Sequence, residues 1–166
     1  MFITGRQQPE LDKAVAAIGR NVITVRGDTS NLVEIDRIYK QLKEKAGRID
    51  VLCVNARFYE DAKFGEITEE HFAKTFNANV QFLFFAVQKA LPLLSQGSPV
   101  ILIGSVVSVK GFESFSVYDA IKAAVRSFAR RWTRGRGIRV RVLRPGHIDA
   151  PGLSVLMNDS RCCSHR

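Results

Sequence analysis

The chain has 166 residues, of which 46% are hydrophobic and 25% are charged. This composition is typical of a single globular domain with its own core, and it excludes a disordered, fibrous or low-complexity chain. Lysine and arginine number 25 against 16 acidic residues, for a formal charge of +9. Such an excess makes nucleic acid and anionic cofactors the partners to consider.

Cysteines and apolar runs bear on the cellular compartment. Cys53 lies in an apolar run, and Cys162 and Cys163 are neighbours, so the three do not form a disulfide framework and a reducing compartment is expected. No segment approaches the ~20 apolar residues that span a bilayer, and the first residues lack a signal-peptide pattern. We therefore expect a cytoplasmic protein with no membrane partner.

Short runs rich in β-branched residues alternate along the chain with segments whose apolar residues recur at helical spacing. Strands are predicted at residues 2–4, 22–25, 49–54, 100–103 and 138–143, and helices at residues 11–18, 31–46, 68–94 and 117–132. Gly19 is placed to end the first helix, and Asn31 and Glu34 have capping-box spacing. This alternation predicts βαβ units and a mainly parallel sheet with helices on both faces.

The densest basic stretch covers residues 126–144. Its two aromatic residues, Phe128 and Trp132, are four apart and share one helix face, which favours packing in the core over stacking on bases. A solvated helix end and loop is therefore the favoured interpretation. Nucleic-acid binding is therefore ranked last among the candidate functions.

Tyr118 and Lys122 lie four residues apart on a predicted helix, so their side chains project from the same face. By itself this spacing is common and fits two ordinary surface residues. Ser105 follows a predicted strand, and Asn79 lies inside the longest predicted helix. Taken singly, Ser105 fits a helix cap or a loop serine, and Asn79 fits a polar residue on an apolar helix.

Together and in this order, these residues resemble the short-chain dehydrogenase/reductase family. The resemblance covers about residues 2–150 and rests on Asn55-Ala56, Asn79-Val80, Gly104-Ser105, Tyr118-x-x-x-Lys122, Gly137-Ile138-Arg139-Val140 and Pro145-Gly146-x-Ile148. It implies a doubly wound, Rossmann-type α/β fold. Residues 1–150 would form a partial catalytic domain, and residues 151–166 a truncated or atypical tail.

The resemblance also implies an NAD(P)-dependent oxidoreductase that interconverts a carbonyl and an alcohol on a small molecule. Tyr118 would exchange a proton with the substrate oxygen. Lys122 would lower the pKa of that phenol, because a nearby ammonium favours tyrosinate, and would also hold the nicotinamide ribose. Ser105 would hydrogen-bond the substrate oxygen, and Asn79 would anchor a water-linked proton relay.

Cofactor contacts follow from the same resemblance. Arg6 resembles the family's basic residue at the 2′-phosphate of NADP, which favours NADP over NAD. Asp28 resembles the aspartate that contacts the adenine. A helix-flanking arginine and a turn aspartate are equally weighted alternatives. The other positions expected to contact the cofactor are Asn55, Ala56, Tyr118, Lys122, Pro145, Gly146 and Ile148.

The sequence departs from the family's pattern at its beginning. The family opens with a strand, a glycine-rich turn and a helix that bind the pyrophosphate. Met1 falls after this unit, and none of the 12 glycines forms such a motif. The missing strand is central in the order 3-2-1-4-5-6. We therefore expect an incomplete sheet, either as two half-sheets with unpaired edges or with the flanking strands paired directly.

Other departures concern the site. Arg57 replaces the glycine of the family's Asn-Ala-Gly and is expected to crowd the nucleotide. Ile121 replaces the small polar residue that usually precedes the lysine, and Arg141 replaces the usual asparagine. The alternative function is a catalytically impaired remnant that acts as an interaction or dimerisation module. Because family members associate through two long helices, here residues 68–94 and 117–132, a homo-oligomer is expected. The three histidines, His71, His147 and His165, are interpreted as incidental.

Overall fold

A computed structural model describes residues 1–55, 58–60, 62–109, 115–135 and 138–146. Ala56, Arg57, His147 and Ile148 lie outside the described residues, as does the predicted tail. The strands are β1 (Phe2–Gly5), β2 (Ile23–Arg26), β3 (Leu52–Val54), β4 (Pro99–Ile103) and β5 (Arg139–Leu143). The helices are α1 (Gln8–Ile18), α2 (Leu32–Ala46), α3 (Glu69–Phe76), α4 (Phe82–Ala90) and α5 (Ser116–Gly135), with short segments η1 (Asn77–Gln81), η2 (Leu91–Leu93) and η3 (Val106–Ser108).

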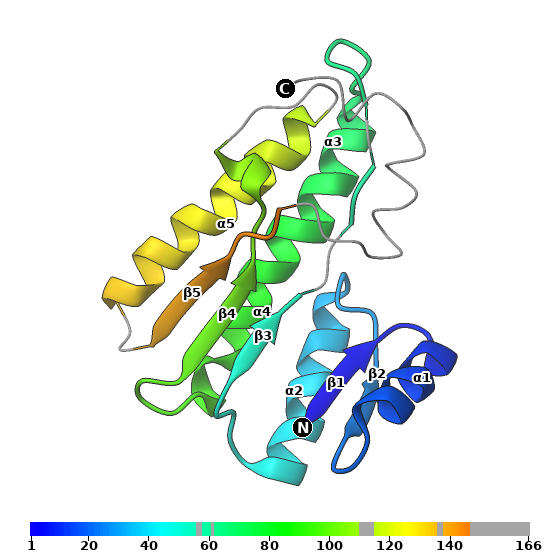
Figure 1. Ribbon diagram of the computed structural model, residues 1–166, viewed down its shortest axis with the longest axis vertical. Coiled ribbons are helices and arrows are strands. Elements are labelled where there is room, and N and C mark those ends of the chain that lie inside the picture. Colours follow the sequence, from blue (N-terminus) through cyan, green and yellow to red (C-terminus); the bar gives the residue numbers. More distant parts are fainter. Residues whose placement is uncertain (56–57, 61, 110–114, 136–137, 147–166) are drawn as a thin grey trace.

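The strands form two separate parallel sheets, one of order β1-β2 and one of order β3-β4-β5. Figure 1 shows the strands of both sheets running in the same direction. The predicted incomplete parallel sheet is confirmed, and of the two expected arrangements the half-sheets are found. Within the described residues, β1 pairs with β2 alone and β3 pairs with β4 alone.

The sequence predicts helix ends at Gly19 and Asn31, and both are found, but the predicted capping box is not. The first helix ends as predicted at Gly19, whose φ of 91° suits glycine. The Asn31 side chain accepts a hydrogen bond from the backbone N–H of Val33 at 2.9 Å and caps α2. The expected capping box is not closed by Glu34. Its carboxylate pairs with Arg37 at 2.6 Å, and the Asn31 N–H that it would bind donates to the Asp28 carbonyl at 3.1 Å.

The long helix predicted over residues 68–94 is interrupted. The Thr68 hydroxyl accepts from the His71 backbone N–H at 3.1 Å and starts α3. The π-helical turn η1 then leads into α4. A π turn widens the helix and rotates everything after it relative to an ideal α-helix, and such turns are frequent at functional sites. Asn79 and Val80 are the buried residues of this turn.

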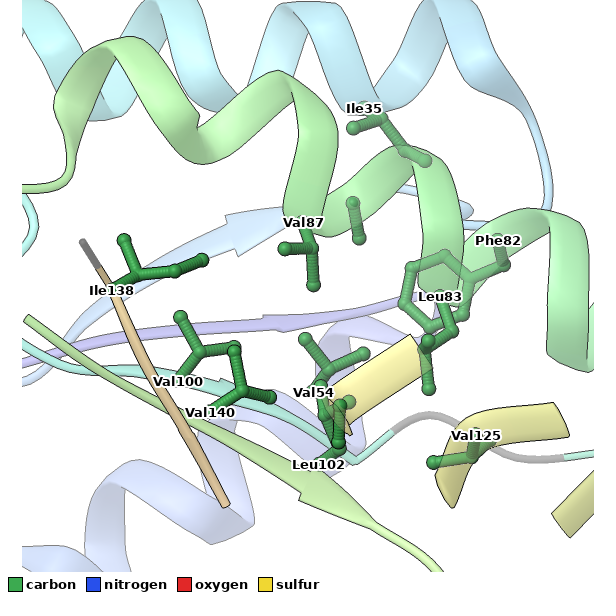
Figure 2. Close-up of a cluster of buried hydrophobic side chains, with 12 residues drawn as sticks. Ile35, Val54, Phe82, Leu83, Val87, Val100, Leu102, Val125, Ile138 and Val140 are labelled. Atoms are coloured by element: carbon green, nitrogen blue, oxygen red, sulfur yellow. The ribbon is translucent and has the colours of Figure 1, made fainter. Parts of the chain in front are cut away.

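One face of the three-stranded sheet forms the main core, with α2, α4 and α5 packed against it (Figure 2). Val100 and Leu102 of β4 are fully buried there. Phe128 and Trp132 pack against this core and stack on each other with their ring centroids 5.2 Å apart. The prediction that these two rings belong to the core is therefore confirmed in part, because they pack against it while remaining half-buried.

Helix α2 joins the two sheets. Its Ile35 lies in the main core, and the Tyr39 hydroxyl donates to the Ala86 carbonyl of α4 at 2.7 Å. Asp36 pairs with Lys89 at the surface. On the other side, α2 contacts β2, where the Ile38 side chain approaches Gly27. Among the described helices, none combines the length and the apolar character needed to cross a membrane.

Candidate active site

The predicted site residues that follow strands all lie just beyond carboxyl ends. Arg6 follows β1, Asp28 follows β2, Asn55 follows β3, Ser105 follows β4, and Pro145 and Gly146 follow β5. Because the strands of both sheets run in one direction (Figure 1), these residues share one edge. This is the edge at which doubly wound sheets bind their ligands.

The Ser105 segment is held against the end of β5. The Gly104 N–H donates to the Leu143 carbonyl at 2.7 Å, and the Val106 N–H donates to the Pro145 carbonyl at 3.2 Å. A Cβ at Gly104 would lie 2.6 Å from Cγ1 of Val142, so this close approach requires glycine. The sheet therefore fixes the backbone on both sides of Ser105.

The side chain of Ser105 is half-buried, and its oxygen accepts from the Val107 N–H at 3.3 Å. The serine therefore caps η3, which is the ordinary alternative considered for it. An oxygen that accepts one hydrogen bond can still donate its own proton. The capping contact orients the hydroxyl without removing its use toward a ligand.

Tyr118 and Lys122 share one face of α5, as their spacing predicts. Lys122 is only 4% exposed, and its Nζ donates to the Ile103 carbonyl at the end of β4 at 2.9 Å. The same nitrogen lies 5.2 Å from the centroid of the Tyr118 ring, within the range of a cation–π interaction. A buried ammonium is thus held beside the phenol by the backbone of the sheet.

Asn79 holds the chain that follows β3. Its Oδ1 accepts from the Phe58 N–H at 3.0 Å, and its Nδ2 donates to the Phe58 and Thr75 carbonyls, each at 2.8 Å. The residue is 4% exposed, so these bonds satisfy a buried amide. Asn79 therefore binds the Phe58 backbone at both its N–H and its carbonyl.

Lys74 of α3 adds a second hold on the same short segment. Its Nζ pairs with Glu60 at 2.8 Å and lies 4.9 Å from the centroid of the Phe58 ring. The hydrogen bond from Lys74 lowers the pKa of the Glu60 carboxyl, so Glu60 keeps its negative charge. Residues 58–60 are therefore attached to α3 and η1 by backbone, ring and charge.

Two other aromatic side chains, those of Tyr59 and Phe115, contact the Tyr118 ring. The Tyr59 ring meets Tyr118 edge-on with centroids 5.3 Å apart and stacks on Phe115 at 5.1 Å. Phe115 and Tyr118 are 6.2 Å apart. Neither Tyr59 nor Phe115 belongs to the predicted site. No local spacing relates residue 59 to residue 118, whereas Phe115 lies three residues before Tyr118 and could have been found from that spacing. For Tyr59 the one available signal was Phe58-Tyr59 shortly after a strand end that bears Asn55.

Arg6 and Asp28 lie together at the ends of β1 and β2. Asp28 Oδ1 accepts from the N–H and the hydroxyl of Ser30 at 2.9 and 2.7 Å. These hydrogen bonds, and to a lesser degree the nearby Arg6 guanidinium, lower the pKa of Asp28. Asp28 is thus a turn aspartate, the ordinary alternative, and it is also a carboxylate beside an exposed guanidinium.

The described residues fit the two ends of a nicotinamide dinucleotide. At one end the Lys122 ammonium and the Tyr118 phenol match a ribose and a reacting oxygen, and at the other the Arg6 guanidinium matches a phosphate. Within the described residues no further strand joins the two sheets, and no glycine-rich turn is present there to bind the pyrophosphate. The middle of the dinucleotide thus has no partner among these residues.

Comparison with known proteins decides the family. The sequence profile described as short chain dehydrogenase matches residues 1–160. The chain belongs to the short-chain dehydrogenase family. Oxidoreductase asL5 of Sarocladium schorii is 40% identical over 153 residues, which are 89% of this chain and 61% of that protein. The chain spans about three fifths of the length of the curated relatives it matches.

Solved structures of short-chain dehydrogenases share the fold. A glucose/ribitol dehydrogenase-type member from Brucella melitensis superposes with a TM-score of 0.89 at 26% identity, covering 96% of this chain and 66% of that one. A short-chain dehydrogenase from Burkholderia cenocepacia in complex with NADP gives a TM-score of 0.81 at 27% identity, covering 90% and 64%. The Rossmann-type fold predicted for this chain is therefore confirmed.

Proposed function

We propose that this chain serves the NAD(P)-dependent interconversion of a carbonyl and an alcohol on a small molecule, with Tyr118, Lys122, Ser105 and Asn79 as its reactive group. The observation that carries the proposal is the buried Lys122 ammonium, bound to the Ile103 carbonyl at 2.9 Å and lying 5.2 Å from the Tyr118 ring. A charge kept beside a phenol at a strand end suits proton transfer.

Each residue has a task in this proposal. Tyr118 passes its proton to the substrate oxygen during reduction and takes it back during oxidation, and the Lys122 ammonium stabilises the tyrosinate that forms. Ser105 donates its hydroxyl proton to the same oxygen and so sets its position. Asn79 holds the segment after β3 in place and serves the proton relay. A bound nicotinamide would supply or accept the hydride.

We propose NADP as the preferred cofactor. The support is Arg6, an exposed guanidinium just beyond the carboxyl end of β1. A guanidinium binds a phosphate dianion by paired hydrogen bonds. The similar Burkholderia cenocepacia protein binds NADP. The remaining proposed contacts are Asn55, Ala56, Pro145, Gly146 and Ile148, and we expect the reaction to take place in the cytoplasm.

The test is the oxidation of NADPH and NADH by the purified chain with a panel of ketones, followed at 340 nm, beside equilibrium binding of both cofactors. Tyr118→Phe removes the phenolic proton and is expected to lower turnover by about 10²- to 10⁴-fold. Tyr39→Phe is the matched control, because it removes a phenol outside the site. Equal rates for wild type and Tyr118→Phe, or no binding of either cofactor at saturation, would overturn the proposal.

A second candidate function is self-association through α4 and α5. Phe84 contacts Phe85, Phe128 and Trp132 with ring centroids 5.4 to 5.7 Å apart, and these four rings are only half-buried. Half-buried aromatic rings on adjacent helices are typical of protein interfaces. Sedimentation of wild type and Phe85→Asp tests this candidate: a dimer that the charge dissociates supports it, and a wild-type monomer at high concentration contradicts it.

A further inference from the structure

The segment after β3 is held more firmly than a surface connection requires. Asn79 binds both the N–H and the carbonyl of Phe58, and Lys74 binds Glu60 while lying over the Phe58 ring. Loops without such contacts are the mobile parts of a fold. The two hydrogen bonds from the buried Asn79 hold the Phe58 backbone next to Tyr59, whereas the half-exposed Lys74–Glu60 pair adds little.

The side chain of Tyr59 meets the proposed proton donor. Tyr59 lies edge-on to Tyr118, with an interplanar angle of 82° and a centroid distance of 5.3 Å, and it stacks on Phe115 at 27° and 5.1 Å. These are the geometries that aromatic pairs prefer. Tyr118 itself is 9% exposed, whereas Tyr59 and Phe115 keep part of their surface exposed. A molecule that approaches the phenol thus approaches two further rings.

We propose that Tyr59 is a specificity-determining residue that, with Phe115, selects carbonyl compounds bearing a flat aromatic ring. The inference rests on the proposed function and adds its substrate class. A further ring gains a favourable aromatic contact with Tyr59 that a saturated ring of the same size does not, and aromatic pairs contribute beyond their buried area. Tyr59 makes this selection without taking part in proton transfer, because Tyr118 and Lys122 carry that step.

The experiment compares β-tetralone with 2-decalone, two bicyclic ketones that differ in the aromaticity of one ring. It uses the full 166-residue chain as wild type, Tyr59→Leu and Tyr59→Phe. The preference is the ratio of kcat/KM for the two ketones with NADPH. Tyr59→Leu is expected to lower it by about two- to tenfold, the size of one aromatic contact. Tyr59→Phe keeps the ring and is expected to keep the preference.

A merely structural role for Tyr59 predicts a different result. If the ring only supports the fold around Tyr118, Tyr59→Leu lowers kcat/KM for both ketones by the same factor and leaves their ratio unchanged, which would overturn the inference. A ratio that falls in Tyr59→Phe as far as in Tyr59→Leu would point to the hydroxyl rather than the ring and overturn the inference as well. Circular dichroism confirms that the variants are folded.

Binding without turnover separates this inference from the proposed function. Saturation-transfer NMR measures β-tetralone binding to wild type, Tyr118→Phe, Tyr59→Phe and Tyr59→Leu. Weaker binding in Tyr59→Leu alone supports the aromatic selection even where no oxidation of NADPH is detected. Equal binding by all four chains contradicts the role of Tyr59 but leaves the chemistry of Tyr118 intact. Turnover unaffected by Tyr118→Phe contradicts the proposed function instead.

Discussion

The half of the molecule built on β3, β4 and β5 differs from the half built on β1 and β2 in how its strands are covered. In the first half, Val100 and Leu102 of β4 are fully buried beneath α4 and α5. In the second, α1 contributes a single buried residue, Leu11, and β2 contributes Val25. The two halves are joined through α2 rather than through a strand.

This difference also divides the proposed site. Tyr118, Lys122 and Ser105 belong to the well-covered half, whereas Arg6 and Asp28 belong to the thinly covered one. Side chains that carry proton transfer need fixed positions. A phosphate contact made by a long arginine tolerates more movement. The half that holds the reactive residues is the half whose packing can hold them still.

The largest expected effect comes from a matched pair of core substitutions. Leu102→Ala removes a fully buried side chain from the main core, which is expected to lower the free energy of unfolding by about 3–5 kcal/mol. Leu11→Ala, at a 5% exposed position in the smaller half, is expected to cost about 2 kcal/mol, since that site can collapse more easily. Urea unfolding followed by circular dichroism, which reports the helices of both halves, measures both.

Amide hydrogen exchange of the Leu102→Ala and Leu11→Ala variants shows which half of the molecule loses stability in each. Leu11→Ala is expected to speed exchange in β1 and β2 while leaving β4 protected, because the thinly covered half opens locally. Leu102→Ala is expected to speed exchange in both halves. Equal losses of stability with identical exchange patterns would show that the two halves unfold as one unit.

A smaller effect is expected at the joint between the halves. Tyr39→Phe removes the hydrogen bond from the buried Tyr39 hydroxyl to the Ala86 carbonyl, which contributes about 0.5–1.5 kcal/mol. Burial also raises the pKa of Tyr39, so this contact persists across the ordinary pH range. Urea unfolding at pH 7 and pH 9 is expected to give the same difference from wild type at both values. A difference that vanishes at pH 9 would contradict a contact made by the neutral phenol.

The smallest effect concerns the Asp36–Lys89 ion pair, which connects α2 with α4. Asp36 is 60% exposed and Lys89 26% exposed, so water screens their attraction. A double-mutant cycle with Asp36→Asn and Lys89→Met is expected to give a coupling below about 1 kcal/mol, falling as salt rises. A coupling several times larger and independent of salt would make this pair, and not Tyr39, the main joint.

Much of the fold follows from periodicity, and its exceptions have physical causes. The five predicted strands and the predicted parallel pairing are present, and the half-sheets are one of the two arrangements that the sequence left open. The π turn at Asn77–Gln81 was not predicted, because the apolar residues around it keep a helical spacing. Glu34 has the spacing of a capping box, but the Asn31 N–H that it would bind donates to the Asp28 carbonyl.

The site shows the same division between local and distant information. Spacing alone places Tyr118 and Lys122 on one helix face, and the structure has them there. The contact of Tyr59 with Tyr118 joins residues far apart in the chain, so it depends on which strand ends meet at one edge. Ser105 caps a short helical turn and Asp28 stabilises a turn, as the non-catalytic interpretations of these two residues expected. Short hydrogen bonds of this kind are compatible with a second role.

The hydrogen bond from Lys122 to the Ile103 carbonyl affects which substitutions this chain would accept during evolution. Because the ammonium is 4% exposed and bound to a strand end, replacing it removes a donor from the interior and is expected to cost stability as well as chemistry. Selection for folding alone would therefore keep Lys122 in a descendant that no longer catalyses anything. Loss of Tyr118 alone, with Lys122 retained, would be the first trace of such a descendant.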